Sequence, residues 1–288
     1  MAVRNRAAAI PAPLYVIAGV ASTQVGGAIA KTLFGELGPT GTVFLRTVFA
    51  ALALFLLWRP RIAGHTRRDI ALALAFGLSL AAMNQFFYEA LDRIPLGIAV
   101  TIEFVGPLAV AVGGSRRALD LVWVALAATG ILLLARGGGD VNTEGVAFAL
   151  LAGACWAAYI LLSVRTGRAF PGGSGLALAM VFGSVLLLPA GVAGAGSSLL
   201  DPGLMAAAAG VAMLSSAIPY SLELEALRRM PARVFGILLS LEPALAALAG
   251  FVILGEGLRV RDGIAIALVA AASAGASVSA EAPHAPEA

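Results

Sequence analysis

Long apolar runs recur from one end of this chain to the other, and they restrict its possible folds more than any other feature. Each run is about 17–25 residues long, which is the length that an α-helix needs to cross a bilayer. Only 12% of the residues are charged and 60% are hydrophobic, whereas roughly a quarter of a soluble domain is charged. The sequence therefore predicts an all-α polytopic membrane protein.

Glycine, proline and charged residues separate the runs, as turn chemistry favours at the connections between helices. The start of the chain also has features of a signal peptide, with Arg4 and Arg6 ahead of an apolar stretch. We interpret this stretch as a first span, because the run is long and fits the repeat described below. We predict ten transmembrane spans, at 12–30, 40–58, 70–90, 95–114, 119–136, 145–164, 175–194, 204–225, 232–254 and 262–280.

The distribution of positive charge predicts the orientation of these spans. If the N-terminus is cytoplasmic, thirteen of the 19 Lys and Arg fall in cytoplasmic segments, five fall on the other side, and Arg46 lies within a span. Because cytoplasmic loops carry an excess of Lys and Arg, we expect both termini in the cytoplasm. The same distribution explains the basic pI of about 9.5, so we do not expect nucleic acid as a partner.

Parts of the sequence repeat. The segment YEALDRIP at 88–95 matches LEALRRMP at 224–231 with an offset of 136 residues, and this offset also carries Pro107 onto Pro243. Further on, DLVWVALA at 120–127 pairs with DGIAIALV at 262–269. The repeat unit contains five spans, and an odd unit enters the membrane from opposite sides in its two copies. Inverted repeats of this kind are typical of transporters whose site lies near the midplane.

The repeat divides the chain into two similar halves joined by a short loop. The expected parts are a cytoplasmic tail at 1–11, a first five-helix repeat at 12–137, a linker at 138–144, a second repeat at 145–280 and a cytoplasmic tail at 281–288. The sequence carries no indication of the oligomeric state.

Several kinds of chemistry find no support in the sequence. Cys155 is the only cysteine, so no disulfide framework is expected. The two histidines, His65 and His284, fall in a loop and in the tail, which argues against a buried histidine metal site. No phosphate-binding loop, HExxH, paired-cysteine or GxSxG motif occurs. We therefore expect no metal, no cofactor and no enzymatic activity.

Two acids lie deep within predicted spans. Glu103 is about 12 Å past Pro95, and Glu242 is about 16 Å past Pro231 from the other face, at 1.5 Å per residue. A carboxylate at the centre of a membrane helix costs roughly 2.5–3.5 kcal/mol on insertion scales and usually marks a substrate or proton site. We therefore interpret both glutamates as substrate-binding or coupling residues. The alternative is a structural carboxylate bonded to a neighbouring helix.

A proline follows each acid, Pro107 four residues after Glu103 and Pro243 one residue after Glu242. Proline removes a backbone donor and frees the carbonyl one turn earlier, and a freed carbonyl in a membrane must face protein or water. We therefore expect both prolines to bend their helices at the wall of a polar cavity. In repeat register Glu103 falls one turn from Gly106, which is the equivalent of Glu242.

Other polar side chains within the spans complete the predicted site. Asn84 and Tyr88 are four residues apart and share a helix face, although an interfacial aromatic is an alternative for Tyr88. Arg46 either pairs with an acid or attracts a substrate carboxylate, and the sequence does not decide between these roles. Lys31, at a span end, is expected to extend to the membrane interface. The remaining candidate residues for substrate binding or coupling are Gln24, Trp156, Tyr159, Tyr220 and Glu223.

Two long segments are distinctive: IPLGIAVTIEFVGPLAVAVGGSRRALDLVWVALA at 94–127 and SSAIPYSLELEALRRMPARVFGILLSLEPALAALAGFVILGEGL at 215–258. They resemble the EamA-type transporters of the drug/metabolite transporter superfamily, and within that group the branch of bacterial inner-membrane threonine and homoserine exporters. The shorter segments AIAKTLF at 28–34, MNQFFYEAL at 83–91 and AGACWAAYIL at 152–161 extend the likeness over nearly the whole chain.

The resemblance implies ten helices in two inverted repeats, and export of small amino acids across the inner membrane driven by protons. In this hypothesis a zwitterionic amino acid enters a central cavity from the cytoplasm. Glu103 or Glu242 meets its ammonium group or carries the coupling proton, and the two repeats then move to expose the site on the other side. The alternatives are an EamA-type exporter of another metabolite or drug, and a membrane receptor or scaffold that does not transport.

Overall fold

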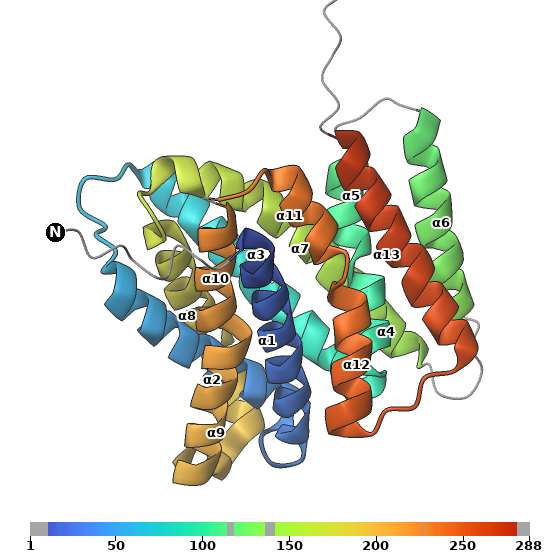
Figure 1. Cartoon of the computed structure of the whole chain (residues 1–288). Coiled ribbons are helices and arrows are strands. Elements are labelled where there is room, and N and C mark those ends of the chain that lie inside the picture. The colour runs from blue at the N-terminus through green and yellow to red at the C-terminus, as the bar shows by residue number, and fades with distance from the viewer. Residues whose placement is uncertain (1–10, 114–117, 136–141, 228, 281–288) are drawn as a thin grey trace, which may run out of the picture.

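The structure of this protein is a computed structural model that describes residues 11–113, 118–135, 142–227 and 229–280. Helices make up its body (Figure 1). No strand occurs in these ranges. The helices of the first half are α1 (Ala12–Thr32), α2 (Phe34–Trp58), α3 (Arg67–Arg93), α4 (Leu96–Glu103), α5 (Val105–Gly113) and α6 (Ala118–Ala135).

The second half begins with two long helices and then contains several shorter ones. They are α7 (Thr143–Ala169), α8 (Ser174–Ala195), the 3₁₀-helix η2 (Gly196–Leu200), α9 (Pro202–Ala212), the π-helix η3 (Met213–Ala217), α10 (Ile218–Leu227), α11 (Ala232–Leu239), α12 (Glu242–Leu254) and α13 (Val260–Ala280).

Nine helical segments of the described chain are long and apolar enough to cross a membrane, and α6 contributes a shorter apolar helix at Leu119–Leu134. The protein is therefore an all-α polytopic membrane protein, as the apolar runs predict. The inverted relation of its two halves and the domain boundaries stay predictions.

Local sequence explains where several helices begin. Thr66 caps α3 because its hydroxyl accepts from the Asp69 N–H at 3.2 Å, while the Asp69 carboxylate accepts from the Thr66 N–H at 2.9 Å. This reciprocal arrangement satisfies two donors that the first turn leaves free. Asn142 caps α7 in a simpler way, through a 2.7 Å bond from the Glu144 N–H to its side-chain oxygen. Both caps lie in the predicted loops, so each marks the start of its helix at a predicted boundary between spans.

The two helices that follow Pro95 and Pro231 are alike. Both α4 and α11 have eight residues and begin directly after the proline. Both end at a break, at Phe104 (φ −61°, ψ −11°) and at Ser240 (φ −64°, ψ −9°), and these positions differ by the 136-residue offset. The predicted bends therefore occur as short breaks two to three residues before the prolines Pro107 and Pro243.

Helix pairs from the two halves pack against one another. α2 packs along α8 and α3 along α7, whereas α1 contacts both α10 and α12. On one flank, α6 and α13 lie side by side and run in opposite directions (Figure 1). The breaks after α4 and α11 thus lie inside the bundle, where α7 packs on α4 and α5, and α1 packs on α11 and α12.

Candidate functional site

A buried arginine lies at the centre of the candidate site. Arg46, on α2, is only 8% exposed. Its guanidinium donates to the side-chain oxygen of Asn84 at 2.7 Å and to the Tyr88 hydroxyl at 3.3 Å, both on α3. It also donates to the Ser216 hydroxyl at 3.2 Å and to the Ser215 carbonyl at 3.1 Å. All four acceptors are neutral, and in the described chain no carboxylate oxygen lies within 4.0 Å of this guanidinium.

The α3 side chains are held in place for this contact. Asn84 donates its amide hydrogen to the Leu80 carbonyl at 2.8 Å, which points its oxygen toward Arg46. Tyr88 is fully buried, and its ring lies 5.5 Å from the guanidinium carbon of Arg46. Tyr88 therefore packs inside the protein, and it shares a face of α3 with Asn84 because both side chains bond to Arg46.

The other two acceptors come from the π-helix η3, which the sequence did not indicate. A π-turn shifts the hydrogen-bonding register by one residue and is frequent at functional sites. The Ser22 hydroxyl of α1 donates to the Leu214 carbonyl at 2.6 Å. Gly26 of α1 lies so near that a Cβ there would come within 2.9 Å of Ser215. Helix α1 therefore supports η3 where it meets Arg46.

The two predicted acids lie on either side of the breaks. Glu103 is the last residue of α4 and is 7% exposed, whereas Glu242 is the first residue of α12. The Glu242 carboxylate accepts from the Gln24 amide at 2.9 Å. Glu103 is close enough to Glu242 and Arg46 to interact with both electrostatically, yet no hydrogen bond from the described residues reaches its carboxylate. The structure thus brings together Gln24, Glu103, Glu242 and Arg46.

Pro107 acts on the backbone at Glu103. It has no N–H for the Glu103 carbonyl four residues earlier. That oxygen instead faces Gly153 of α7, where a Cβ would lie only 2.7 Å away. The freed carbonyl therefore packs on the α7 backbone rather than on a cavity, so the expectation of a polar cavity wall at this carbonyl is wrong. Trp156, one turn further along α7, packs edge-on against Phe104 with ring centres 5.2 Å apart.

A cavity of about 330 Å³ opens near the ends of α2 and α7. Three of the predicted site residues, Tyr159, Tyr220 and Glu223, line it. Trp58 at the end of α2 and Gly172 in the connection between α7 and α8 also line it. Both connections lie on the side that the positive charges predict to be cytoplasmic.

Tyr220 connects this cavity to the charged cluster. It lines the cavity and is also near enough to Arg46, Glu103 and Glu242 to interact with them electrostatically. The Tyr159 ring packs at a tilt against Phe76 of α3, with ring centres 5.1 Å apart. Aromatic side chains and Glu223 therefore line the cavity, and Tyr220 is common to the cavity and to the surroundings of the charged cluster.

Polar contacts join the helices at the opposite end of the bundle. Lys31 of α1 forms a 2.7 Å ion pair with Glu256 and donates to the Ile94 carbonyl at 3.0 Å. The second oxygen of Glu256 accepts from the Leu96 N–H at 2.8 Å. Lys31 is therefore held in an ion pair instead of extending to the interface. No sequence pattern indicates this pair, because its partners are 225 residues apart.

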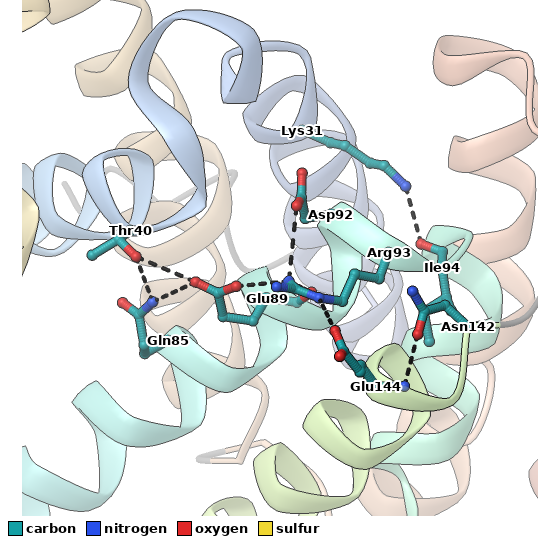
Figure 2. A network of polar contacts seen from close by, with 9 residues as sticks. All are labelled: Lys31, Thr40, Gln85, Glu89, Asp92, Arg93, Ile94, Asn142 and Glu144. Carbon is teal, nitrogen blue, oxygen red and sulfur yellow. Dashed lines mark hydrogen bonds and ion pairs between the residues drawn. The ribbon is translucent and has the colours of Figure 1, made fainter. Parts of the chain in front are cut away.

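Figure 2 shows a second group of contacts at the same end, centred on Arg93. Arg93 pairs with Glu89 at 2.7 Å and with Glu144 of α7 at 3.4 Å. Glu89 also accepts from Gln85 at 3.0 Å and from Thr40 of α2 at 3.3 Å. These contacts tie α2, α3 and α7 together, and a second hollow of about 330 Å³ lies beside Arg93, Glu144 and Phe148.

Comparisons with known proteins agree with these features. Residues 143–278 match the EamA-like transporter family. The threonine/homoserine exporters RhtA of Salmonella typhimurium strain LT2 and Escherichia coli strain K12 are each 42% identical over 271 residues, covering 92% of this chain and 90% of theirs. One solved crystal structure superposes with a TM-score of 0.63 and 18% identity, covering 93% of this chain and 97% of that one, and so supports the fold alone.

A multi-pass helical bundle with buried charges between its two halves is typical of membrane transporters. The extent of the sequence identity makes the assignment specific: the chain belongs to the EamA-like transporter family. No group of three or more His, Cys, Asp or Glu that could hold a metal ion occurs in the part of the chain that the structure describes.

Proposed function

We propose that this protein exports small hydroxylated amino acids, such as threonine and homoserine, across a bacterial inner membrane. The 42% identity to threonine/homoserine exporters over nearly the full length of both chains supports this substrate class. One structural observation carries the proposal: Arg46, Glu103 and Glu242 form a cluster of both charge signs inside the bundle, next to a cavity that shares Tyr220 with it. A zwitterionic amino acid needs groups of both signs, and a membrane interior supplies neither without such residues.

The position of the cavity suggests how substrate enters. It opens beside Trp58 and Gly172, on the side that carries the excess of arginine, so we take that side to be cytoplasmic. At the other end, the ion pair of Lys31 with Glu256 and the contacts of Arg93 hold the helices together, and the second hollow of about 330 Å³ lies beside Arg93. We assign this arrangement to the cytoplasm-open state of an exporter that works by alternating access, because the cytoplasmic cavity shares Tyr220 with the charged cluster.

Protons are the driving ion in this proposal, and the two glutamates carry them. Burial away from water disfavours the charged form of a carboxylate, so Glu103 and Glu242 can take up a proton in one state and release it in another. Both acids adjoin helix breaks at positions related by the repeat, and such breaks are where transporters bind substrate and ions. The Gln24 bond to Glu242 would be exchanged when the substrate ammonium arrives.

The proposal is tested by counterflow in proteoliposomes loaded with unlabelled threonine or homoserine. We expect saturable uptake of labelled threonine, with none in protein-free liposomes. A non-transporting receptor would bind threonine without this exchange. An exporter of another solute would show no exchange with threonine but would show it with a member of a wider metabolite panel.

Substitution of the acids tests the coupling. We expect Glu103→Gln and Glu242→Gln each to lower proton-driven export at least tenfold. A tenfold loss corresponds roughly to the free energy of one hydrogen bond to a charged group. The control is Glu36→Gln, which neutralises an exposed acid at the start of α2 and should leave transport unchanged. Normal rates and normal pH dependence in both test variants would show that neither acid couples.

A further inference from the structure

We infer that Arg46 is a substrate-binding residue, and that its guanidinium receives the α-carboxylate of the transported amino acid. This inference rests on the proposed function and adds the group that recognises the substrate's negative end. The starting observation is the unusual environment of Arg46, which combines deep burial with purely neutral hydrogen-bond partners.

Burial of a guanidinium without a carboxylate partner has a high cost in free energy. Moving an ion out of water costs several kcal/mol even after relaxation, and neutral acceptors recover only part of this cost. The protein pairs other cations directly: Lys31 lies 2.7 Å from Glu256, and Arg93 lies 2.7 Å from Glu89. Arg46 is more buried than either, yet within the described chain it is not ion-paired. A structural arginine alone does not explain this difference.

Acidic side chains nevertheless lie near Arg46. Glu103 and Arg46 interact electrostatically, and Glu103 interacts with Glu242 in turn. The cluster therefore presents a positive group and a negative group that approach each other without forming a pair. An α-amino acid carries one charge of each sign at its two ends, so it complements this arrangement with its carboxylate toward Arg46 and its ammonium toward Glu103 or Glu242.

The Arg46 guanidinium has an N–H donor that a substrate carboxylate could use. It carries five N–H groups in a planar fork that matches a carboxylate. Four hydrogen bonds to described residues are present, and the bond to the Tyr88 hydroxyl, at 3.3 Å, is the longest. A carboxylate would use the remaining N–H and replace the Tyr88 bond. Because these partners lie on α3 and η3, the exchange would also change how both elements are held.

The approach to Arg46 supports this role. Tyr220 lines the cavity on one side and interacts electrostatically with Arg46 and the acids on the other. A substrate in the cavity therefore meets Tyr220 first and the charged cluster next. Movement of Tyr220 is the step that would admit the carboxylate to Arg46.

The test compares two competitors of labelled threonine exchange in proteoliposomes, L-threonine and L-threonine methyl ester. The ester keeps the ammonium and hydroxyl groups but has no negative charge. We expect the wild type to prefer threonine to the ester by at least tenfold. In Arg46→Gln, the apparent affinity for threonine should fall about 10- to 100-fold, whereas affinity for the ester should change less than about threefold.

Arg46→Lys provides a second variant, because it keeps the charge but loses the fork geometry. We expect its preference for threonine over the ester to lie between those of the wild type and Arg46→Gln. If only Arg46→Lys folds, the same ratio decides the question, and an unchanged ratio overturns the inference.

The outcomes separate the inference from the proposed function. If a substituted protein loses threonine and the ester equally, Arg46 is structural and the inference is wrong. If Arg46→Gln keeps the wild-type preference, the inference is also wrong, while amino-acid export stands. If the folded wild type exchanges no amino acid at all, the proposed function itself fails, and the inference fails with it.

Discussion

A single methyl group at Gly106 should damage both the stability and the transport activity of this protein. Gly106 is the second residue of α5, where this helix crosses α7. A Cβ built there would lie 2.0 Å from the Gly153 carbonyl oxygen and 2.8 Å from the Gly153 carbonyl carbon. These are backbone atoms of a helix, so no side chain can rotate to make room.

The size of the effect follows from two opposing contributions. Alanine is favoured over glycine by about 1 kcal/mol within a helix, which alone would stabilise Gly106→Ala. An ordinary contact needs at least 3.4 Å, so α5 and α7 must separate by more than 1 Å, and overpacking of this kind costs typically about 1–3 kcal/mol. The cost should reach the upper part of this range, because the obstacle is backbone. We expect a net loss of about 1–2 kcal/mol.

Transport should fall further than stability suggests. The same crossing holds the Glu103 carbonyl against Gly153 and brings Trp156 onto Phe104. A shift of about 1 Å in positioning groups can cost two orders of magnitude in rate, so a loss of at least tenfold in exchange is expected.

The assay measures thermal unfolding in detergent and threonine exchange in proteoliposomes for Gly106→Ala. The matched control is Gly113→Ala, which makes the same change in the same helix where nothing lies within 4 Å of the new Cβ. The control should keep wild-type stability and exchange. If Gly106→Ala also behaves like the wild type, the α5–α7 crossing is not the close backbone contact described above, and its part in positioning Glu103 is refuted.

Two further predictions concern the closed end and the helix break. A double-mutant cycle of Lys31→Met and Glu256→Gln should give a coupling of about 1–2 kcal/mol in the free energy of unfolding. The pair is partly buried, so its strength should fall between those of exposed and of buried ion pairs. The control is Asp92→Asn, which removes a carboxylate that is 44% exposed and should change the free energy of unfolding by less than about 0.5 kcal/mol. If the coupling between Lys31 and Glu256 is no larger than this, the pair does not stabilise its end of the bundle. Pro107→Ala restores a donor for the Glu103 carbonyl and should slow exchange several-fold. The control is Pro189→Ala, at an exposed position of α8, which should leave the exchange rate unchanged. Equal exchange rates in the two variants would contradict the role of the helix break at Phe104.

Much of the fold could be predicted from sequence because membranes simplify the problem. Hydrocarbon requires long apolar helices, and these leave a strong signal in composition. The exceptions are local: the π-turn at Met213–Ala217 has no signature in the sequence, and neither does the division of the fourth span into α4 and α5 at Phe104. The proline at 107 indicated a bend but not that the helix would break three residues earlier.

The site was predictable in its residues and not in its contacts. Buried acids and amides within apolar runs are conspicuous, so Glu103, Glu242, Gln24 and Asn84 could be named from the sequence. Their partners depend on how α1, α2, α3, α4 and α12 pack. Sequence order gives no measure of that packing when the bonded residues are 218 apart, as Gln24 and Glu242 are. Arg46 remained ambiguous for the same reason, since its role depends on which acceptors surround it.

The different positions of the two acids can be explained by packing. At one crossing α7 meets α5 through Gly106 and Gly153, which leaves no room for a side chain. At the crossing related by the 136-residue offset, α1 meets α12 through the bond between Gln24 and Glu242. A glutamate at 106 would force α7 away, so the first half can carry its acid only where a side chain fits, one turn earlier at Glu103. Sequence alone gives the displacement of one turn, but its cause is the backbone contact that only the packed helices reveal.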